Sequence, residues 1–383
     1  MRLVVTGGGT GGHIYPALAV AQAAQALPNI ESVTFIGKLG GLESELVPQN
    51  GVDFEGIKFH GMPREKNMFL LFRYLGWCYS LARARSHARK ILQRLKPDVV
   101  FGTGGYVSAP VLMAANGLKI PFVIHEPDAK PGLVNQLMSH QAAAITTSFS
   151  EGVNILKKRP NQQVVVTGNP IRGAIGKFTK EEALQHLGIT WPAQQRILLV
   201  TGGSQGSRRI NQAVVQALPT LINEYGLAVV HLTGKILYDE TLEALETQSP
   251  GLKDHPNYWV RPYSGDMAAL LALANLAICR AGSLSLSEMA VCGVPTILVP
   301  YPFAAANHQA ENAFACVRAG AAVLIHDRDF TGDNLLLGVQ PLMEHPEHLL
   351  LMRQAALSMG HPNATDDILK CLELVAQQKR RNA

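Results

Sequence analysis

Short apolar runs alternate with longer amphipathic stretches along the whole chain, a pattern typical of a parallel β-sheet covered by helices on both faces. The strands predicted in the first half are Leu3–Thr6, Val33–Gly37, Val52–Ile57, Val99–Gly102, Phe122–His125, Ala143–Thr146 and Val164–Thr167. Those predicted in the second half are Ile197–Thr201, Ala228–Leu232, Tyr258–Val260, Leu276–Cys279, Thr296–Val299 and Ala322–Ile325. Amphipathic helices are predicted between them, for example Ser283–Val291 and Asn307–Arg318. The sequence therefore predicts an α/β protein.

A chain of 383 residues is too long for one ordinary hydrophobic core, so we expect two domains. The turn-rich segment Gly168-Asn169-Pro170-Ile171-Arg172 follows the last strand of the first half and marks the boundary. We assign residues 1–167 and 168–344 to two Rossmann-like, doubly wound domains. The segment from about 345 to 383 ends in a helix with Ile368, Leu372 and Val375 on one face, and we expect it to pack back on the first domain.

Composition narrows the class of protein. Hydrophobic residues make up 47% of the chain and charged residues 16%, as in a globular protein with well-filled cores. Five cysteines without a C-x-x-C pair favour free thiols in a reducing compartment over disulfides or a zinc site. The chain enters a core strand at its N-terminus, so we expect no signal peptide, and no apolar run approaches the roughly 18–20 residues of a spanning helix. A net charge of +5 is too small to indicate a nucleic-acid partner.

Two glycine-rich turns follow strands at matching places in the two halves. The first is Gly7-Gly8-Gly9-Thr10-Gly11-Gly12-His13, and the second is Thr201-Gly202-Gly203-Ser204-Gln205-Gly206. A turn from a strand into a helix presents unpaired N–H groups and the positive end of a helix dipole to an anion. Glycine lets the backbone approach a phosphate closely. The pair predicts two domains that face a shared central cleft.

The first turn matches the dinucleotide pattern Gly7-x-Gly9-x-x-Gly12, which also needs an acidic residue at the end of the second strand to hold a ribose. That strand ends in Lys38 instead, which disfavours NAD or FAD. His13 stands at the predicted helix start, where it is placed either for acid–base work or for a hydrogen bond that fixes the loop.

Further polar groups follow other strands, and parallel strands all end at one side of a sheet. Gly102-Thr103-Gly104-Gly105-Tyr106 is a second candidate nest of backbone amides, or a structural turn. His125-Glu126-Pro127-Asp128 brings three ionisable groups to the same edge, or forms a rigid turn. In the second half, small residues open a helix at Ser283, and Glu288 in its second turn is a ribose ligand or a favourable acid near a helix start. Asp327-Arg328-Asp329 fits the D-x-D pattern of metal-dependent sugar transferases but has no partner cluster, so a surface turn is favoured.

An apolar and aromatic segment stands beside a basic stretch. Residues Met68–Trp77 are too short to span a membrane, and five aromatic residues fall between Phe69 and Tyr79. Seven basic residues crowd a helical stretch that overlaps this segment and continues beyond it: Arg73, Arg83, Arg85, Arg89, Lys90, Arg94 and Lys96. Such a surface suits the headgroup region of an anionic membrane, and the alternative is a buried helix of the first domain. We predict a membrane patch made of Phe69, Phe72, Trp77, Arg73, Arg85 and Arg89.

Taken in order, these segments resemble the MurG family, UDP-GlcNAc transferases that convert lipid I to lipid II in peptidoglycan synthesis. The motifs that carry the resemblance are Gly8-Gly9-Thr10-Gly11-Gly12-His13, Gly104-Gly105-Tyr106-Val107-Ser108, His125-Glu126, Gly168-Asn169-Pro170-Ile171-Arg172, Gly202-Gly203-Ser204-Gln205-Gly206, the block Ser283–Glu288, Gln309 and Pro362-Asn363-Ala364-Thr365. The resemblance implies the GT-B fold, with the active site in the cleft between two Rossmann-like domains. It also implies a peripheral enzyme on the cytoplasmic face of the bacterial inner membrane. Such an enzyme serves cell-wall biogenesis, cell shape and cell division, with other cell-wall synthesis proteins as further partners.

The resemblance also implies roles for residues. Those that would bind the donor UDP-GlcNAc are Thr10, Gly11, Gly12, Asp128, Arg172, Ser204, Ser264, Ser283, Leu284, Ser285, Leu286, Ser287, Glu288 and Gln309. Those that would lie against the acceptor diphosphate are Gly8, Gly9, Gly104, Gly105 and Tyr106. Two positions depart from the family. It usually has asparagine where this chain has Asp128, and a member can have isoleucine where Ser264 stands near the uracil.

In the mechanism that the resemblance implies, the 4-hydroxyl of MurNAc on lipid I attacks the anomeric carbon of GlcNAc in one inverting displacement. His13 is our first candidate for the general base, and Glu126 is the second. Helix N-terminal amides and Arg172 would stabilise the leaving UDP, so we expect no metal and no other cofactor. The alternatives are a UDP-GlcNAc 2-epimerase, another GT-B glycolipid transferase, an NAD-dependent oxidoreductase and a noncatalytic cell-wall scaffold.

Overall fold

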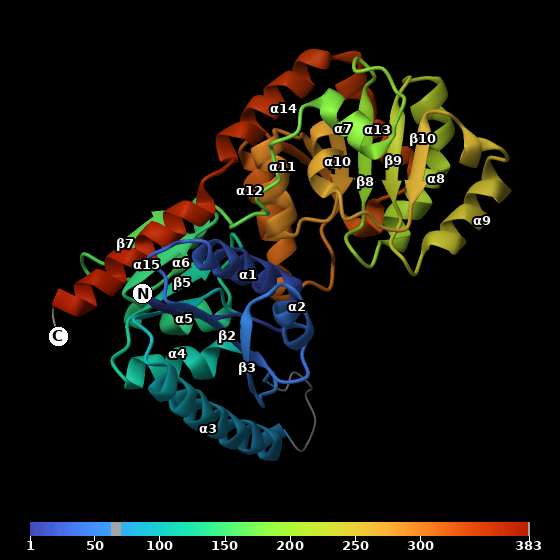
Figure 1. Cartoon of the computed structure of the whole chain (residues 1–383). Coiled ribbons are helices and arrows are strands. Elements are labelled where there is room, and N and C mark those ends of the chain that lie inside the picture. The colour runs from blue at the N-terminus through green and yellow to red at the C-terminus, as the bar shows by residue number, and fades with distance from the viewer. Residues whose placement is uncertain (63–69, 382–383) are drawn as a thin grey trace. The chain divides into compact units, whose positions relative to one another are not determined.

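The computed structural model describes residues 1–62 and 70–381 and divides into two compact units (Figure 1). Unit 1 comprises Met1–Ile171 together with Asn363–Ala383, and unit 2 comprises Arg172–Pro362. Each unit is built on one parallel β-sheet.

The sheet of unit 1 has the strand order β3-β2-β1-β4-β5-β6-β7, and every neighbouring pair is parallel. Its strands are β1 Arg2–Thr6, β2 Ser32–Lys38, β3 Asp53–Ile57, β4 Val99–Gly102, β5 Phe122–Glu126, β6 Ala144–Thr147 and β7 Gln163–Val166. Its helices are α1 Gly11–Gln25, α2 Glu43–Gln49, α3 Leu70–Leu95, α4 Ser108–Gly117, α5 Leu133–Met138, α6 Ser150–Ile155 and α15 Ala364–Arg381.

Alternate side chains of these strands enter two separate cores. Leu3 and Val5 of β1 pack with α1 and α15, whereas Val4 packs on the other face with α3 and α4. Because both faces are covered, central strands such as β1 and β4 are buried and mostly apolar, as their sequences predicted. The edge strands β3 and β7 carry polar and exposed residues. The predicted apolar face of the last helix lies in the first of these cores, where Ile368 and Leu372 are fully buried.

Unit 2 repeats this topology, with the strand order β10-β9-β8-β11-β12-β13 and parallel pairing throughout. Its strands are β8 Ile197–Thr201, β9 Ala228–Leu232, β10 Tyr258–Arg261, β11 Leu276–Cys279, β12 Thr296–Leu298 and β13 Ala322–Leu324. Its helices are α7 Lys180–Leu187, α8 Arg208–Asn223, α9 Tyr238–Gln248, α10 Met267–Leu273, α11 Ser283–Cys292, α12 His308–Arg318, α13 Gly332–Glu344 and α14 Pro346–Met359. Its main core joins α8 and α13 to the strands.

The unit limits differ from the predicted domain limits at both ends of unit 2. The division falls between Ile171 and Arg172, a few residues after the predicted one, and unit 2 runs on to Pro362. Helix α14 packs against α11 within unit 2, and the backbone at Gly360 lies against Ala290. The expectation that everything from about 345 packs on the first domain is therefore wrong for α14, and within the described residues it holds for α15.

The strand order places a topological switch point in each sheet. In unit 1, β2 and β3 lie on one side of β1, and the chain then crosses to β4 on the other side. In unit 2, β9 and β10 lie on one side of β8, and the chain then crosses to β11 on the other side. At such a point, the loops after the two central strands diverge and leave a crevice at their carboxyl ends, where α/β proteins bind ligands. Both predicted glycine turns, after β1 and β8, lie at these points.

Candidate active site

The turns that follow β1 and β4 in unit 1 touch through their backbones. Gly105 has a φ of +74°, and a Cβ atom there would lie only 2.0 Å from the carbonyl oxygen of Gly8. Gly104 is also left-handed, with a φ of +91°, and an added Cβ would lie 3.1 Å from the amide nitrogen of Asn135. Only glycine fits this approach without displacing the neighbouring turn. The fold thus brings together Gly8, Gly104 and Gly105, three of the predicted acceptor-side residues.

His13 is held between these turns by Thr103, the residue that directly follows β4. The ring atom Nδ1 of His13 lies 2.9 Å from the carbonyl oxygen of Thr103, and the Thr103 hydroxyl donates to the His13 carbonyl at 2.6 Å. A carbonyl accepts only, so Nδ1 carries the proton of the neutral ring. Nε2 is then the nitrogen that bears the lone pair, as a general base requires. Thr103 is fully buried, and the glycine-rich sequence around it did not indicate that it holds His13.

Glu126, the second predicted base, is buried at the end of β5. One carboxylate oxygen accepts from the backbone N–H of Asp128 at 3.0 Å. The other accepts from the N–H of Gly132 at 3.0 Å and from the Asn135 amide at 2.8 Å. Burial raises the pKa of Glu126 to about 8, and the neighbouring Asp128 carboxylate contributes in the same direction. These contacts favour a role in shaping the 127–132 loop over proton abstraction.

His125 points into the sheet and not toward solvent. Its ring lies 3.0 Å from the Thr146 hydroxyl on one side and 3.0 Å from the Asn169 amide oxygen on the other. Burial lowers the pKa of His125 to about 4, so the ring is neutral at neutral pH. Asn169 also donates to the carbonyl of Pro127 at 3.3 Å. The motif around residues 168–172 therefore braces the loop after β5, a role that its turn-rich sequence did not reveal.

The remaining predicted residues of unit 1 lie around the same edge. Gly9, Thr10 and Gly12 are exposed, Gly11 is partly exposed, and Asp128 is 8% exposed. Beneath the turn lies the buried carboxylate of Glu43, which accepts from the N–H of Lys38 at 3.0 Å. A Cβ on Gly8 would lie within 2.4 Å of that carboxylate. Glu43 was not predicted, because nothing in its sequence neighbourhood indicates that it packs beneath the distant turn after β1.

In unit 2, the N-terminus of α11 follows β11 at the switch point. Gly282 is the N-cap of the helix, which has no acidic residue in its first turn. The first backbone N–H groups of an α-helix have no partner within the helix and attract anions. Of the predicted block, Ser285 is exposed, Leu284 and Ser287 are partly exposed, and Ser283, Leu286 and Glu288 are buried.

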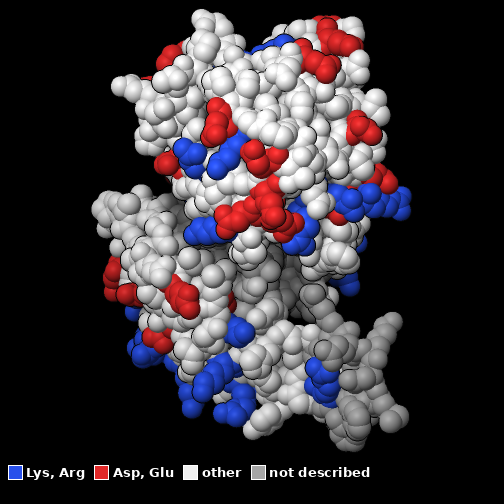
Figure 2. Space-filling model, turned by 90° about the vertical axis from the view of Figure 1, so that its right-hand side faces the viewer, with Lys and Arg blue, Asp and Glu red and all other residues white. Residues whose placement is uncertain are grey.

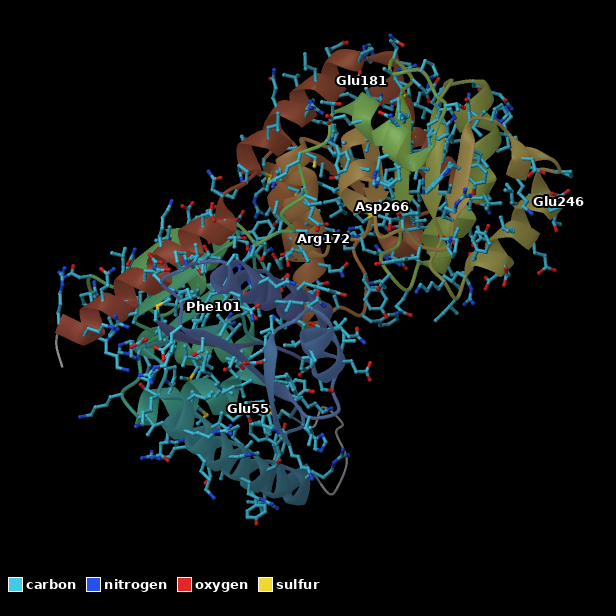
Figure 3. All side chains as sticks on the ribbon, viewed as in Figure 1. Glu55, Phe101, Arg172, Glu181, Glu246 and Asp266 are labelled. Atoms are coloured by element: carbon cyan, nitrogen blue, oxygen red, sulfur yellow. The ribbon has the colours of Figure 1, made fainter. Side chains whose placement is uncertain are left out.

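Arg172 and Glu288, both predicted to contact UDP, form an ion pair with each other. The Arg172 Nε donates to a Glu288 carboxylate oxygen at 3.0 Å, and Arg172 lies beside α11 (Figure 3). The side chain of Glu288 is 6% exposed and that of Arg172 is 50% exposed. Burial raises the pKa of Glu288, while the guanidinium acts in the opposite direction. A buried carboxylate thus orients a cation whose other nitrogens remain accessible to a ligand.

Arg280, directly after β11, joins the loops at this edge. Its guanidinium donates to the Ser207 hydroxyl at 2.6 Å, to the Val299 carbonyl at 3.0 Å and to the Asp327 carboxylate at 2.5 Å. Arg328 and Asp329 are exposed, as expected of a surface turn, whereas the side chain of Asp327 is only 19% exposed because Arg280 engages it. Ser207 is the N-cap of α8 and ends the loop that carries Ser204. The ion pair therefore braces the second glycine turn, a role that the sequences around Arg280 and Asp327 do not reveal.

The other predicted donor residues of unit 2 lie on loops or at helix starts. Ser204 is exposed in the turn after β8, and the Ser264 hydroxyl accepts from the N–H of Asp266 at 3.0 Å. Gln309 accepts from the N–H of Tyr301 at 2.9 Å, which ties α12 to the loop after β12. Asn312, one turn later, is buried and donates to the Ala281 carbonyl at 3.2 Å, so α12 also holds the residues that precede α11.

The predicted membrane patch lies on or near α3. Phe69 lies outside the described residues, and the side chain of Phe72 is not described. Arg73, Arg85 and Arg89 are exposed, together with Leu75 at 60% and Tyr79 at 66%. Helical spacing puts Leu75, Tyr79, Arg85 and Arg89 on one face, whereas Ala84, Ala88 and Ile91 are buried on the opposite one. In Figure 2, Lys and Arg gather toward the bottom of the molecule, the end at which α3 lies in Figure 1.

Two features of the described residues bear on cofactors and membranes. Residues 1–62 and 70–381 bring no three His, Cys, Asp or Glu side chains together in a way that could hold a metal ion. Among the same residues, no helix combines the length and the apolar content needed to cross a bilayer.

Known families match both halves of the chain. Residues 3–147 match the glycosyltransferase family 28 N-terminal domain, and residues 197–368 match the glycosyltransferase family 28 C-terminal domain. The chain belongs to glycosyltransferase family 28. A relative from Desulfitobacterium hafniense (strain DSM 10664 / DCB-2), named UDP-N-acetylglucosamine--N-acetylmuramyl-(pentapeptide) pyrophosphoryl-undecaprenol N-acetylglucosamine transferase, is 42% identical over 375 residues. These residues cover 97% of this chain and 99% of the relative.

Two solved structures share the fold of this chain. The crystal structure of Acinetobacter baumannii MurG matches with a TM-score of 0.75 and 27% identity over 97% of this chain and 99% of that one. The resemblance to MurG and the two-domain GT-B fold are therefore confirmed. A UDP-GlcNAc 2-epimerase from Neisseria meningitidis matches with a TM-score of 0.66 but only 16% identity over 97% of this chain and 99% of that one, which shows a shared fold alone.

Proposed function

We propose that this family 28 transferase moves GlcNAc from UDP-GlcNAc to the MurNAc 4-hydroxyl of lipid I, undecaprenyl-pyrophosphoryl-MurNAc-pentapeptide, and so forms lipid II. The observation that carries the proposal is the match over nearly the whole chain to a relative named for this transfer. The 2-epimerase reaction is less well supported, because the epimerase neighbour is only 16% identical. The site contains candidate residues for donor binding, for stabilisation of the leaving UDP and for proton transfer.

The donor would be held at the switch point of unit 2. The N-terminal amides of α11, from Ser283 on, would receive the diphosphate, and Arg172 would bring a positive charge that Glu288 orients. As the bond from the anomeric carbon to the UDP oxygen breaks, its electron pair passes to the diphosphate. Amide dipoles and a fixed cation that already point to this charge stabilise it without rearranging. Gln309, held against the Tyr301 N–H, would contact the GlcNAc.

The acceptor would be bound and deprotonated in unit 1. The MurNAc 4-hydroxyl attacks the anomeric carbon from the face opposite UDP, which inverts the configuration from α to β. Its proton passes to Nε2 of His13, because Nδ1 is already protonated and bound to the Thr103 carbonyl. Glu126 would hold the 127–132 loop in place through its three hydrogen bonds. The acceptor diphosphate would lie against the glycine turns at Gly8 and Gly104.

We propose that the reaction needs no metal ion. Arg172 and the α11 amides supply the positive charge that a metal supplies in other sugar transferases. Asp327, one of the two aspartates of the D-x-D pattern, is engaged by Arg280. The alternative of a noncatalytic cell-wall scaffold rests only on Asp128, which replaces the usual asparagine of the family. Turnover of a soluble lipid I analogue would exclude it.

We also propose that the enzyme binds the cytoplasmic face of the inner membrane as a peripheral protein. The outward face of α3 combines exposed Leu75 and Tyr79 with Arg85 and Arg89. Apolar side chains beside cations suit the headgroup region of an anionic bilayer, where each cation near the surface adds about 1 kcal/mol. The surface also suits an acceptor whose lipid tail stays in the membrane.

The direct test is to incubate the purified protein with UDP-GlcNAc and a soluble lipid I analogue. Stoichiometric release of UDP with formation of the GlcNAc-MurNAc product is expected. Formation of ManNAc without acceptor would identify an epimerase instead, and no turnover with either would leave the scaffold role.

A further inference from the structure

Unlike the exposed Leu75 and Tyr79, Trp77 is only partly exposed and packs against the segment that follows β3. Its indole ring lies 6.1 Å from the ring of Phe59, centroid to centroid, and its N–H donates to the carbonyl of His60 at 3.2 Å. It stands two, three and four turns away from Ala84, Ala88 and Ile91 on the buried face of the helix, since helical positions repeat at 3.6 residues. Leu75 and Tyr79 lie on the opposite, exposed face.

The segment that Trp77 contacts is itself packed against Tyr106. Phe59 is 1% exposed, and its ring lies 6.0 Å from the ring of Tyr106. Gly61, two residues further on, would place a Cβ only 3.5 Å from the same tyrosine ring. The short segment after β3 is therefore enclosed by Trp77 of α3 on one side and Tyr106 of the β4–α4 loop on the other.

Tyr106 in turn lies against the first glycine turn. A Cβ on Gly9 would lie 2.7 Å from the edge of the Tyr106 ring, and Gly9 has a φ of +87°, so the turn leaves just enough room for the ring. A continuous series of ring and backbone contacts thus runs from Trp77 through Phe59 and Tyr106 to Gly9. Packed groups of this kind transmit displacements, because protein interiors have little free volume.

We propose that Trp77 is a positioning residue for the turn after β1, and that it acts through Phe59 and Tyr106. The proposal rests on the proposed function, since it takes the backbone at Gly9 as the place of the acceptor diphosphate. It corrects the prediction that Trp77 belongs to the membrane patch. The exposed face of α3 carries Leu75 and Tyr79, whereas Trp77 on the other face couples the helix to the turn after β1.

Steady-state kinetics with the soluble lipid I analogue test this role. Trp77→Ala is expected to raise the acceptor KM about tenfold and to leave the Kd for UDP unchanged, because a displaced turn misplaces the acceptor only. Trp77→Phe keeps a ring against Phe59 and is expected to restore most of the loss. His87→Ala, an exposed ring-bearing residue of the same helix, is the matched control and should leave the KM unchanged. An unchanged acceptor KM in Trp77→Ala overturns the proposal, and so does a rise in His87→Ala of the same size.

Fluorescence separates this role from membrane contact without relying on turnover. In a Trp191→Phe, Trp259→Phe background, all indole emission comes from Trp77. Vesicles of brominated phosphatidylglycerol should leave this emission unquenched, whereas a Tyr79→Trp, Trp77→Phe reporter in the same background should be quenched. Equal quenching of both reporters overturns the proposal. Failure of the proposed function would look different, because the unsubstituted protein would then transfer no GlcNAc to the analogue.

Discussion

His13 and Thr103 hold each other through two hydrogen bonds that run in opposite directions. The Thr103 hydroxyl donates to the His13 carbonyl at 2.6 Å, and the His13 Nδ1 donates to the Thr103 carbonyl at 2.9 Å. The first bond fixes the start of α1, and the second fixes both the orientation and the tautomer of the ring. One buried residue of the β4 loop therefore presents the lone pair of His13 at the switch point of unit 1.

Replacing His13 is expected to affect the chemical step. His13→Ala should lower kcat by about 10²–10⁴ with little change in the Kd for UDP, because the proposed proton acceptor is lost and the proposed UDP contacts lie in unit 2. Thr103→Val is the companion variant, since it keeps the carbonyl that binds Nδ1 and removes only the hydroxyl. It should lower kcat much less than His13→Ala does. A near-native kcat for His13→Ala would give the base role to another group or to solvent.

Glu288 and Arg172 are expected to act as one unit in UDP binding. Glu288→Ala removes the acceptor that orients the guanidinium, and a hydrogen bond to a charged group is worth roughly 1.5–3 kcal/mol, or about ten- to a hundredfold in Kd. Glu288→Gln keeps an oxygen for Arg172 and should lose less. Isothermal titration with UDP measures both. An unchanged Kd in Glu288→Ala would remove the residue from the site.

The sequence predicted the strands well because a buried parallel strand is a short apolar run that turn residues delimit on both sides. Val99–Gly102, Ile197–Thr201 and Leu276–Cys279 are predicted to the residue. The glycine turns were also found, because a close backbone approach requires glycine. Braces such as Arg280–Asp327 and Glu43–Lys38 could not be found, since they join residues whose proximity depends on strand order or on how one loop folds.

Asp327 is expected to stabilise the fold and to play no part in metal binding. Asp327→Asn removes the charge that faces Arg280 and should lower the free energy of unfolding by about 1–3 kcal/mol, because a partly buried guanidinium loses its counter-ion. The exposed neighbour Asp329→Asn is the control and should leave stability unchanged. Transfer should proceed at the full rate in excess EDTA. A rate that requires a divalent ion would return both aspartates to consideration as ligands.

The two buried groups at the end of β5 predict opposite pH dependences of stability. The pKa of His125 falls from 6.5 in the unfolded chain to about 4, so the unfolded state binds more protons and stability is lost as the pH falls from 6.5 toward 4. The pKa of Glu126 rises from 4.5 to about 8, so stability is lost as the pH rises through that window. Urea unfolding across pH 4–9 should show a maximum between these limits. Glu126→Gln should flatten the alkaline limb, and an unaltered limb would show that Glu126 titrates normally.

Membrane binding is expected to depend on the outward face of α3. Replacing both Leu75 and Tyr79 with serine should weaken binding to phosphatidylglycerol vesicles while the fold and the Kd for UDP persist, because both side chains are exposed and hold no core. Leu351→Ser on α14, which is 62% exposed, is the matched control and should bind normally. Arg85→Gln with Arg89→Gln should weaken binding mainly at low salt, since ions screen charges beyond about 10 Å at 0.1 M. Sedimentation with vesicles at two salt concentrations measures each variant. If the Leu75 and Tyr79 double variant sediments like the unsubstituted protein, the membrane contact lies on another surface and the exposed face of α3 has a different partner.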